Sequence, residues 1–131
     1  MDEILLHAID ALYVESTNGA QGARAAFDEL EEHVPGTRGR KFYGTYDPAT
    51  NVYRACVALR PEDEAVDLPR WVIPGGKYAR RKLENWTERI PEIGQTFMAM
   101  ADEAGLRYDP GRPSIEFYRS HNEVILLLPL K

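Results

Sequence analysis

The chain has 131 residues, of which 44% are hydrophobic and 28% charged, as in an ordinary globular domain. A chain of this length buries roughly two-thirds of its unfolded surface, which is enough for one hydrophobic core. No apolar run approaches the ~18 residues of a membrane-spanning helix. The net charge of −5 disfavours a general nucleic-acid partner, because phosphate binding needs clustered basic side chains.

The single cysteine, Cys56, excludes an internal disulfide and cannot by itself form a thiolate metal site. It lies between Ala55 and Val57 in an expected strand, where a small buried thiol is typical. The three histidines are scattered and form no metal-binding pair, so we expect no metal and no cofactor. Asp2 and Glu3 stand where a signal peptide has positive charge, so we expect a cytoplasmic protein.

Residues 5–15, the first element, carry two conflicting signals. Their apolar side chains recur at helical spacing, which favours a helix. The segment Leu12-Tyr13-Val14 has instead the composition of a strand. Local patterns alone leave the choice between helix and strand open.

The rest of the first half gives clearer signals. An apolar stripe at helical spacing predicts a helix that ends at Pro35-Gly36. The members of this stripe are Ala23, Ala26, Phe27, Leu30 and Val34. Residues 41–46 and 52–59 have the composition of two strands, and the turn residues of 47–51 predict a hairpin loop between them.

An acidic stretch at 61–67 separates this half from a second one with the same plan. Residues 71–79 are extended but interrupted by Pro74-Gly75-Gly76. Pro91 can open a helix, because a first-turn proline loses no needed hydrogen bond. That helix stops at Gly105, and its buried stripe consists of Ile93, Phe97, Met100 and Ala104.

Two strands complete the second half, at 113–118 and 124–128, with a turn at Ser120-His121-Asn122 between them. Tyr118 precedes the last strand by six residues, and Tyr46 precedes its own second strand by the same six. This shared spacing indicates that the chain is a duplication.

The fold class that follows is α+β: a duplicated strand-helix-strand-strand repeat with pseudo-twofold symmetry, antiparallel sheets and a central ligand cleft. We expect one domain over residues 1–131, with repeat one at about 1–62 and repeat two at about 67–131. A groove between two packed repeats is a common place for a ligand.

Glu116 is the residue with the strongest local argument for function. In its strand, alternation sends Ile115 and Phe117 to one face, and Glu116 and Tyr118 to the other. If the helices cover the Ile115 face, Glu116 and Tyr118 point into the groove. A carboxylate among aromatic rings suits a cation. A solvated glutamate on an open sheet face fits the same pattern.

Several short strings, in their order and spacing, resemble the GyrI-like superfamily. This superfamily includes effector-binding domains of AraC- and MerR-type multidrug regulators of transcription, and stand-alone integron-associated proteins. The strings are Val72-Ile73-Pro74-Gly75-Gly76-Lys77-Tyr78-Ala79, Arg112-Pro113-Ser114-Ile115-Glu116-Phe117-Tyr118 and Leu128-Pro129-Leu130. The resemblance spans essentially the whole chain. It implies two packed repeats around a cleft for lipophilic, often cationic, molecules, and it implies a strand at residues 5–15.

The resemblance also assigns roles to individual residues. Glu116 matches the family's cleft carboxylate, Tyr118 matches the tyrosine two residues on, and Tyr78 matches the aromatic residue of the Gly-x-Tyr-Ala string. We expect Trp71 and Tyr46 to add further walls to the ligand site, since such rings suit half-wet cavities.

Two departures from the family limit what is carried over. Ile125 stands where many relatives have a second glutamate, so Glu116 would act alone. No helix-turn-helix region accompanies the domain, so we expect no direct nucleic-acid binding. The lack of a long apolar run predicts no membrane partner. A protein partner or a homodimer stays open.

The leading hypothesis is a non-enzymatic protein that binds a lipophilic or aromatic small molecule, with a cation as the ligand that Glu116 suits best. An alternative that the resemblance implies is a hydrolase of cyclopropane-bearing or related small molecules, in which Glu116 would guide water. A third hypothesis is a protein-interaction module of the gyrase-inhibitor kind.

Overall fold

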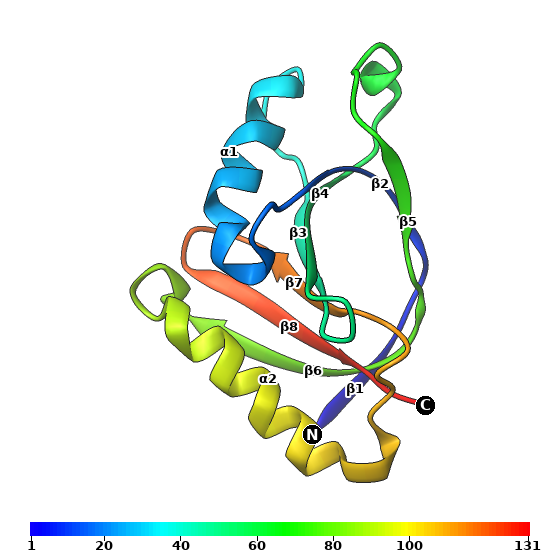
Figure 1. Cartoon of the computed structure of the whole chain (residues 1–131), viewed down its shortest axis with the longest axis vertical. Coiled ribbons are helices and arrows are strands. Elements are labelled where there is room, and N and C mark those ends of the chain that lie inside the picture. The colour runs from blue at the N-terminus through cyan, green and yellow to red at the C-terminus, as the bar shows by residue number, and fades with distance from the viewer.

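The computed structural model describes residues 1–131. Eight strands form one antiparallel sheet in the order β1-β6-β8-β7-β3-β4-β2-β5, and two α-helices pack against it (Figure 1). The strands are β1 Asp2–Leu6, β2 Ile9–Glu15, β3 Phe42–Asp47, β4 Val52–Ala58, β5 Arg70–Ile73, β6 Gly76–Glu84, β7 Ser114–Tyr118 and β8 Glu123–Pro129. The helices are α1 Ala23–His33 and α2 Ile90–Ala104, with short 3-10 turns η1 Gly19–Gly22, η2 Pro61–Asp63, η3 Trp86–Glu88 and η4 Gly105–Arg107.

The sheet curls because its two ends come together. Strands β1 and β2 follow one another along a single extended segment, and so do β5 and β6. These two segments pair with each other in one register, with Leu6 opposite Gly76 and Ile9 opposite Ile73. Strands from the two ends of the strand order therefore lie close together in space (Figure 1).

The first element is a pair of strands, so the helical spacing of residues 5–15 gave the wrong prediction and the resemblance gave the correct one. The reason is burial on both faces of β2. Ala11 and Leu12 point to opposite faces, and each is at most 1% exposed. A strand buried on both faces has a near-continuous apolar run in place of strict alternation.

Both predicted helices are confirmed, and so are the strands predicted at 41–46, 52–59, 113–118 and 124–128, whose bounds are right within two residues. The first helix ends at His33, just before Pro35, and the second has Pro91 in its first turn and stops before Gly105. The extended stretch expected at 71–79 continues further, because β6 runs to Glu84. The fold is α+β, but the sheets are not separate, because β3 pairs with β7 and joins the two halves into one sheet.

The two faces of the sheet have different covers. One face, called here the helix face, packs against α1 and α2 through two apolar clusters. The other, called the inner face, contributes side chains from every strand to one cluster inside the curl. Ile115 and Phe117 lie on this inner face. The groove prediction for Glu116 required the helices to cover the Ile115 face, and this is wrong. The helices cover the face of Glu116 and Tyr118, and the curl of the sheet covers the face of Ile115.

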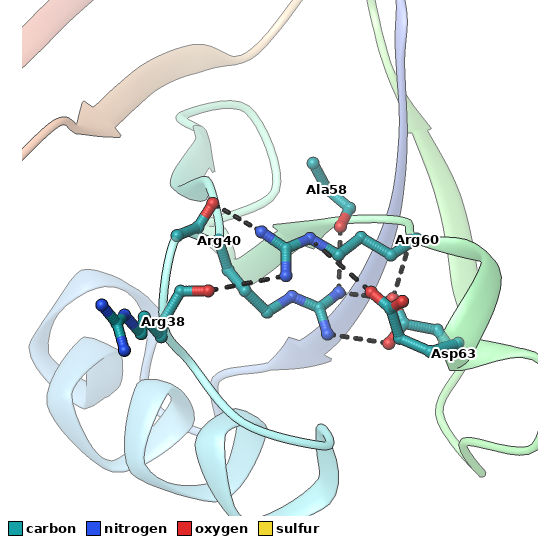
Figure 2. Close-up of polar contacts among 7 residues, drawn as sticks. Arg38, Arg40, Ala58, Arg60 and Asp63 are labelled. Carbon is teal, nitrogen blue, oxygen red and sulfur yellow. Dashed lines mark hydrogen bonds and ion pairs between the residues drawn. The ribbon is translucent and has the colours of Figure 1, made fainter.

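A buried ion pair fixes the chain after α1 (Figure 2). The Arg40 guanidinium donates to both carboxylate oxygens of Asp63, and the two side chains are 1% and 0% exposed. Arg40 also donates to the carbonyl of Ala58 at 3.1 Å. The backbone N–H of Arg60 donates to Asp63 at 2.8 Å, while the Arg60 side chain donates to the carbonyl of Gly39. Both carboxylate oxygens of Asp63 thus accept hydrogen bonds from the protein.

Candidate functional site

Glu116 lies at the centre of the helix face, on β7, where β7 pairs with β3. Two tyrosine hydroxyls donate to the same carboxylate oxygen, Oε1: Tyr53 from β4 at 2.7 Å and Tyr118 from β7 at 2.5 Å. The second oxygen, Oε2, accepts no hydrogen bond from the protein. The side chain is partly buried.

A glycine on the intervening strand makes this contact possible. Gly44 lies directly opposite Glu116 on β3, and it lies opposite Ala55 on β4. A Cβ atom at Gly44 would overlap the Tyr53 hydroxyl and would lie 2.5 Å from Oε1 of Glu116. Tyr53 therefore reaches the carboxylate only because the residue between them has no side chain.

Aromatic rings from separate elements surround the carboxylate. Phe27 of α1 packs edge-on against Tyr118 at 5.3 Å between ring centroids and against Tyr53 at 6.4 Å. Trp86 of η3 packs edge-on against Tyr118 at 4.9 Å, and its indole N–H donates to the carbonyl of Ser120. These rings are called here the aromatic cluster: Phe27, Tyr53, Trp86 and Tyr118.

Glu116 is a carboxylic acid without a positively charged partner in the protein. Burial raises the pKa of Glu116 above its usual value, and the hydrogen bonds from Tyr118 and Tyr53 oppose this rise only in part. Burial and the neighbouring carboxylate also raise the pKa of both tyrosines, so their hydroxyls stay protonated as donors. No lysine, arginine or histidine forms an ion pair with Glu116.

Only two of the predicted site residues come together, Glu116 and Tyr118. Tyr46 also lies on the helix face, but it sits opposite Tyr53 and donates its hydroxyl to Asn51 at 2.8 Å. Tyr118 sits opposite Val124, so the two hairpins differ in pairing register by one residue.

The other two predicted residues lie on the inner face. Tyr78 is 0% exposed and donates its hydroxyl to the carbonyl of Pro74 at 2.6 Å. Trp71 packs edge-on against Tyr13 on the same face. Ile125, at the place of the relatives' second glutamate, is 4% exposed in the inner cluster.

The sequence patterns did not identify Gly44 and Tyr53 as part of the site, and they placed Phe27 only in the apolar stripe of the first helix. A glycine inside an expected strand often marks close approach by another group, so Gly44 could have predicted a contact across this strand. Tyr53 and Phe27 carried no such signal, because their contacts with the site join residues far apart in the sequence.

Two surface hollows lie elsewhere on the molecule. One, of about 500 Å³, lies between β6 and the start of α2 and is lined mainly by charged and polar side chains. The other, of about 600 Å³, lies where β2 meets β5 and includes Trp71 and Arg70. Neither is lined by Glu116. No group of three histidine, cysteine or acidic residues is arranged to hold a metal, and neither helix is long and apolar enough to cross a membrane.

No protein-family model matches the sequence, and no curated protein matches it. Solved structures do match over nearly the whole chain. An integron cassette protein from Vibrio cholerae has a TM-score of 0.70 at 15% identity, over 99% of this chain and 95% of its own. The protein SAV2435, solved with bound tetraphenylphosphonium, has a TM-score of 0.67 at 10% identity, over 99% and 93%.

A third solved structure, a putative transcription regulation protein from Staphylococcus aureus, has a TM-score of 0.66 at 8% identity, over 99% of this chain and 97% of its own. At such low identity these likenesses define the fold alone. The fold is consistent with the GyrI-like one, and proteins that share it include one with a bound small molecule.

Proposed function

We propose that this protein binds a lipophilic, positively charged small molecule at Glu116, without converting it chemically. The carboxylate supplies the charge partner and the aromatic cluster supplies the apolar walls. In this proposal the protein is a receptor of the multidrug-binding kind.

The observation that supports this function best is a desolvated carboxylate with no cation beside it. Removing a carboxylate from water without a positive partner is unfavourable, which is why the pKa of Glu116 is raised. A ligand cation at Oε2 would restore the ionised form and relieve that penalty. Phe27, Tyr118 and Trp86 would add the attraction of their rings for positive charge.

One structural neighbour supports the same class of ligand. Tetraphenylphosphonium, bound to SAV2435, is a cation enclosed by apolar rings. For this chain the likeness in fold makes it the natural first probe.

We propose further that the site forms where the two repeats meet. Gly44, Tyr53 and Phe27 come from residues 1–62, whereas Glu116 and Tyr118 come from residues 67–131. A ligand larger than a few atoms would reach Oε2 by displacing Phe27 or Trp86, since both pack against Tyr118. These two rings belong to different elements, Phe27 to α1 and Trp86 to η3.

The test is the binding of tetraphenylphosphonium to wild type and to Glu116→Gln. Glutamine keeps an oxygen for the tyrosine hydroxyls but removes the charge, so affinity should fall by roughly 2–5 kcal/mol, the loss typical of a desolvated ion pair. Tyr46→Phe is the matched control, because Tyr46 lies on the same face without contacting Glu116. Equal affinity in wild type and Glu116→Gln would contradict the proposal.

The two tryptophans allow the site to be located. Trp86 belongs to the aromatic cluster, whereas Trp71 lies on the inner face. Tetraphenylphosphonium should therefore quench the fluorescence of Trp71→Phe, which keeps Trp86, and leave that of Trp86→Phe nearly unchanged. Quenching of Trp71 alone would place the cation on the wrong face.

Hydrolysis is the second candidate for the same residues, because a carboxyl group with a raised pKa can act as a general acid or base. Incubation with a cyclopropane-bearing substrate separates the two. A product heavier by one water that does not form with Glu116→Gln would support a hydrolase and contradict the receptor proposal.

A further inference from the structure

Arg54 of β4 lies on the inner face, on the opposite side of the sheet from Glu116, and it is nearly without partners. Its guanidinium carbon is 4.6 Å from the ring centroid of Trp71 and 5.3 Å from that of Tyr13. The side chain is only 24% exposed. None of its N–H groups donates a hydrogen bond to the protein, and its buried Nε has no partner.

The one ion-pair partner of Arg54 is held loosely. Oε1 of Glu15 lies 3.7 Å from the guanidinium, beyond hydrogen-bond distance, and the Glu15 side chain is 54% exposed. Arg40 on the same half of the chain shows the contrast, since it is even less exposed but donates to Asp63 and to Ala58. A largely buried guanidinium without hydrogen bonds is unfavourable. The N–H groups of Arg54 are therefore free to donate to an acceptor.

A second polar group with no partner lies beside it. Thr45 is directly opposite Arg54 across the β3–β4 pair, on the same face. It is 1% exposed, and its hydroxyl oxygen has no hydrogen-bond partner. Two unpaired donors from neighbouring strands therefore share one place on the inner face. Trp71, whose ring is in contact with Arg54, also lines the hollow of about 600 Å³ at β2 and β5.

We propose that this group, Arg54 with Thr45, Tyr13 and Trp71, is a second binding site, specific for a small aromatic carboxylate. A carboxylate matches the planar fork of a guanidinium with two parallel hydrogen bonds. Rings of the ligand would pack on Trp71 and Tyr13 beside the guanidinium. The site does not depend on the function of Glu116, because the two groups lie on opposite faces of the sheet.

The test uses 2-naphthoate as the probe and the fluorescence of Trp71 in a Trp86→Phe background. Saturable binding of 2-naphthoate is expected, and Arg54→Met should weaken it by about tenfold or more, the loss expected for hydrogen bonds to a charged group. Arg54→Lys should recover only part of the affinity, because lysine keeps the charge without the fork. The uncharged 2-naphthamide should bind at least about tenfold more weakly than 2-naphthoate.

A second variant guards against a folding defect in Arg54→Met. Glu15 is exposed and competes for the guanidinium, so Glu15→Gln should tighten 2-naphthoate binding by up to about fivefold, as expected for loss of a surface ion pair. Equal binding of naphthoate and naphthamide, or affinity unchanged in both Arg54→Met and Glu15→Gln, would overturn the site. Glu116→Gln should leave 2-naphthoate binding unchanged, which separates this test from that of the proposed function.

Discussion

Two carboxylates of this protein, Asp63 and Glu116, have opposite surroundings. Asp63 receives a guanidinium and a backbone N–H, whereas Glu116 receives only two neutral hydroxyls. The hydrogen bonds from Arg40 hold the pKa of Asp63 below its usual value, and burial raises that of Glu116. The same chemical group therefore forms a structural ion pair at Asp63 and has no positively charged partner at Glu116.

The difference lies in the source of the positive charge. At Asp63 the chain itself supplies it, so the carboxylate is satisfied in the free protein and connects the segment after α1 to η2 (Figure 2). At Glu116 the chain supplies no positive charge, and in the proposed function the ligand cation would supply it.

Removal of the Arg40 side-chain charge should have the largest effect on stability. Arg40→Met leaves Asp63 ionised and enclosed, and breaking a buried pair in this way costs about 3–5 kcal/mol of the free energy of unfolding. Urea unfolding followed by circular dichroism measures the loss. The double variant Arg40→Met/Asp63→Leu should recover most of it, since no unpaired charge remains. A loss below about 1 kcal/mol in the single variant would mean that the pair behaves as a surface ion pair.

Gly44→Ala should damage the Glu116 site and stability together. The new Cβ would overlap the Tyr53 hydroxyl and crowd Glu116, so the tyrosine must leave the carboxylate. Overpacking of this kind costs about 1–3 kcal/mol, and tetraphenylphosphonium binding should weaken.

Gly94→Ala provides the control for Gly44→Ala. Gly94 lies in α2, where an added Cβ would meet no atom within 4 Å, so alanine there should stabilise the helix by up to about 1 kcal/mol. If Gly44→Ala is as harmless as Gly94→Ala, the close contact across β3 is not required.

The smallest effect is in the pH dependence of stability. Because the folded pKa of Glu116 is raised, the folded state binds its proton more tightly than the unfolded state does. Wild type should therefore lose stability relative to Glu116→Gln as pH rises from the ordinary carboxyl pKa of about 4.3 through the raised folded value. Unfolding of both proteins over a pH series measures this difference.

Asp63 should show the reverse sign. Its folded pKa is lowered, so the stability that the pair contributes is present above the ordinary carboxyl pKa and is lost as pH falls through the lowered value. Comparison of wild type with Arg40→Met/Asp63→Leu in acid should reveal it. For Glu116, a wild type that gains stability relative to Glu116→Gln as pH rises would contradict the description of this residue as an unpaired acid.

Local sequence patterns specify where most strands and both helices form, and which residues share a face of β7. Turn residues, helix stripes and a first-turn proline are local signals, so most element bounds came out within two residues. Alternation placed Glu116 with Tyr118 and apart from Ile115 for the same local reason.

Tertiary packing sets which face of the sheet the helices cover and which groups contact Glu116. Both faces of β7 are covered, one by the helices and one by the curl of the sheet, so alternation could not tell them apart. Tyr53 reaches Glu116 across 63 positions of sequence because Gly44 between them has no side chain. The pairing of strands far apart in the chain created that contact, and no local pattern encodes it.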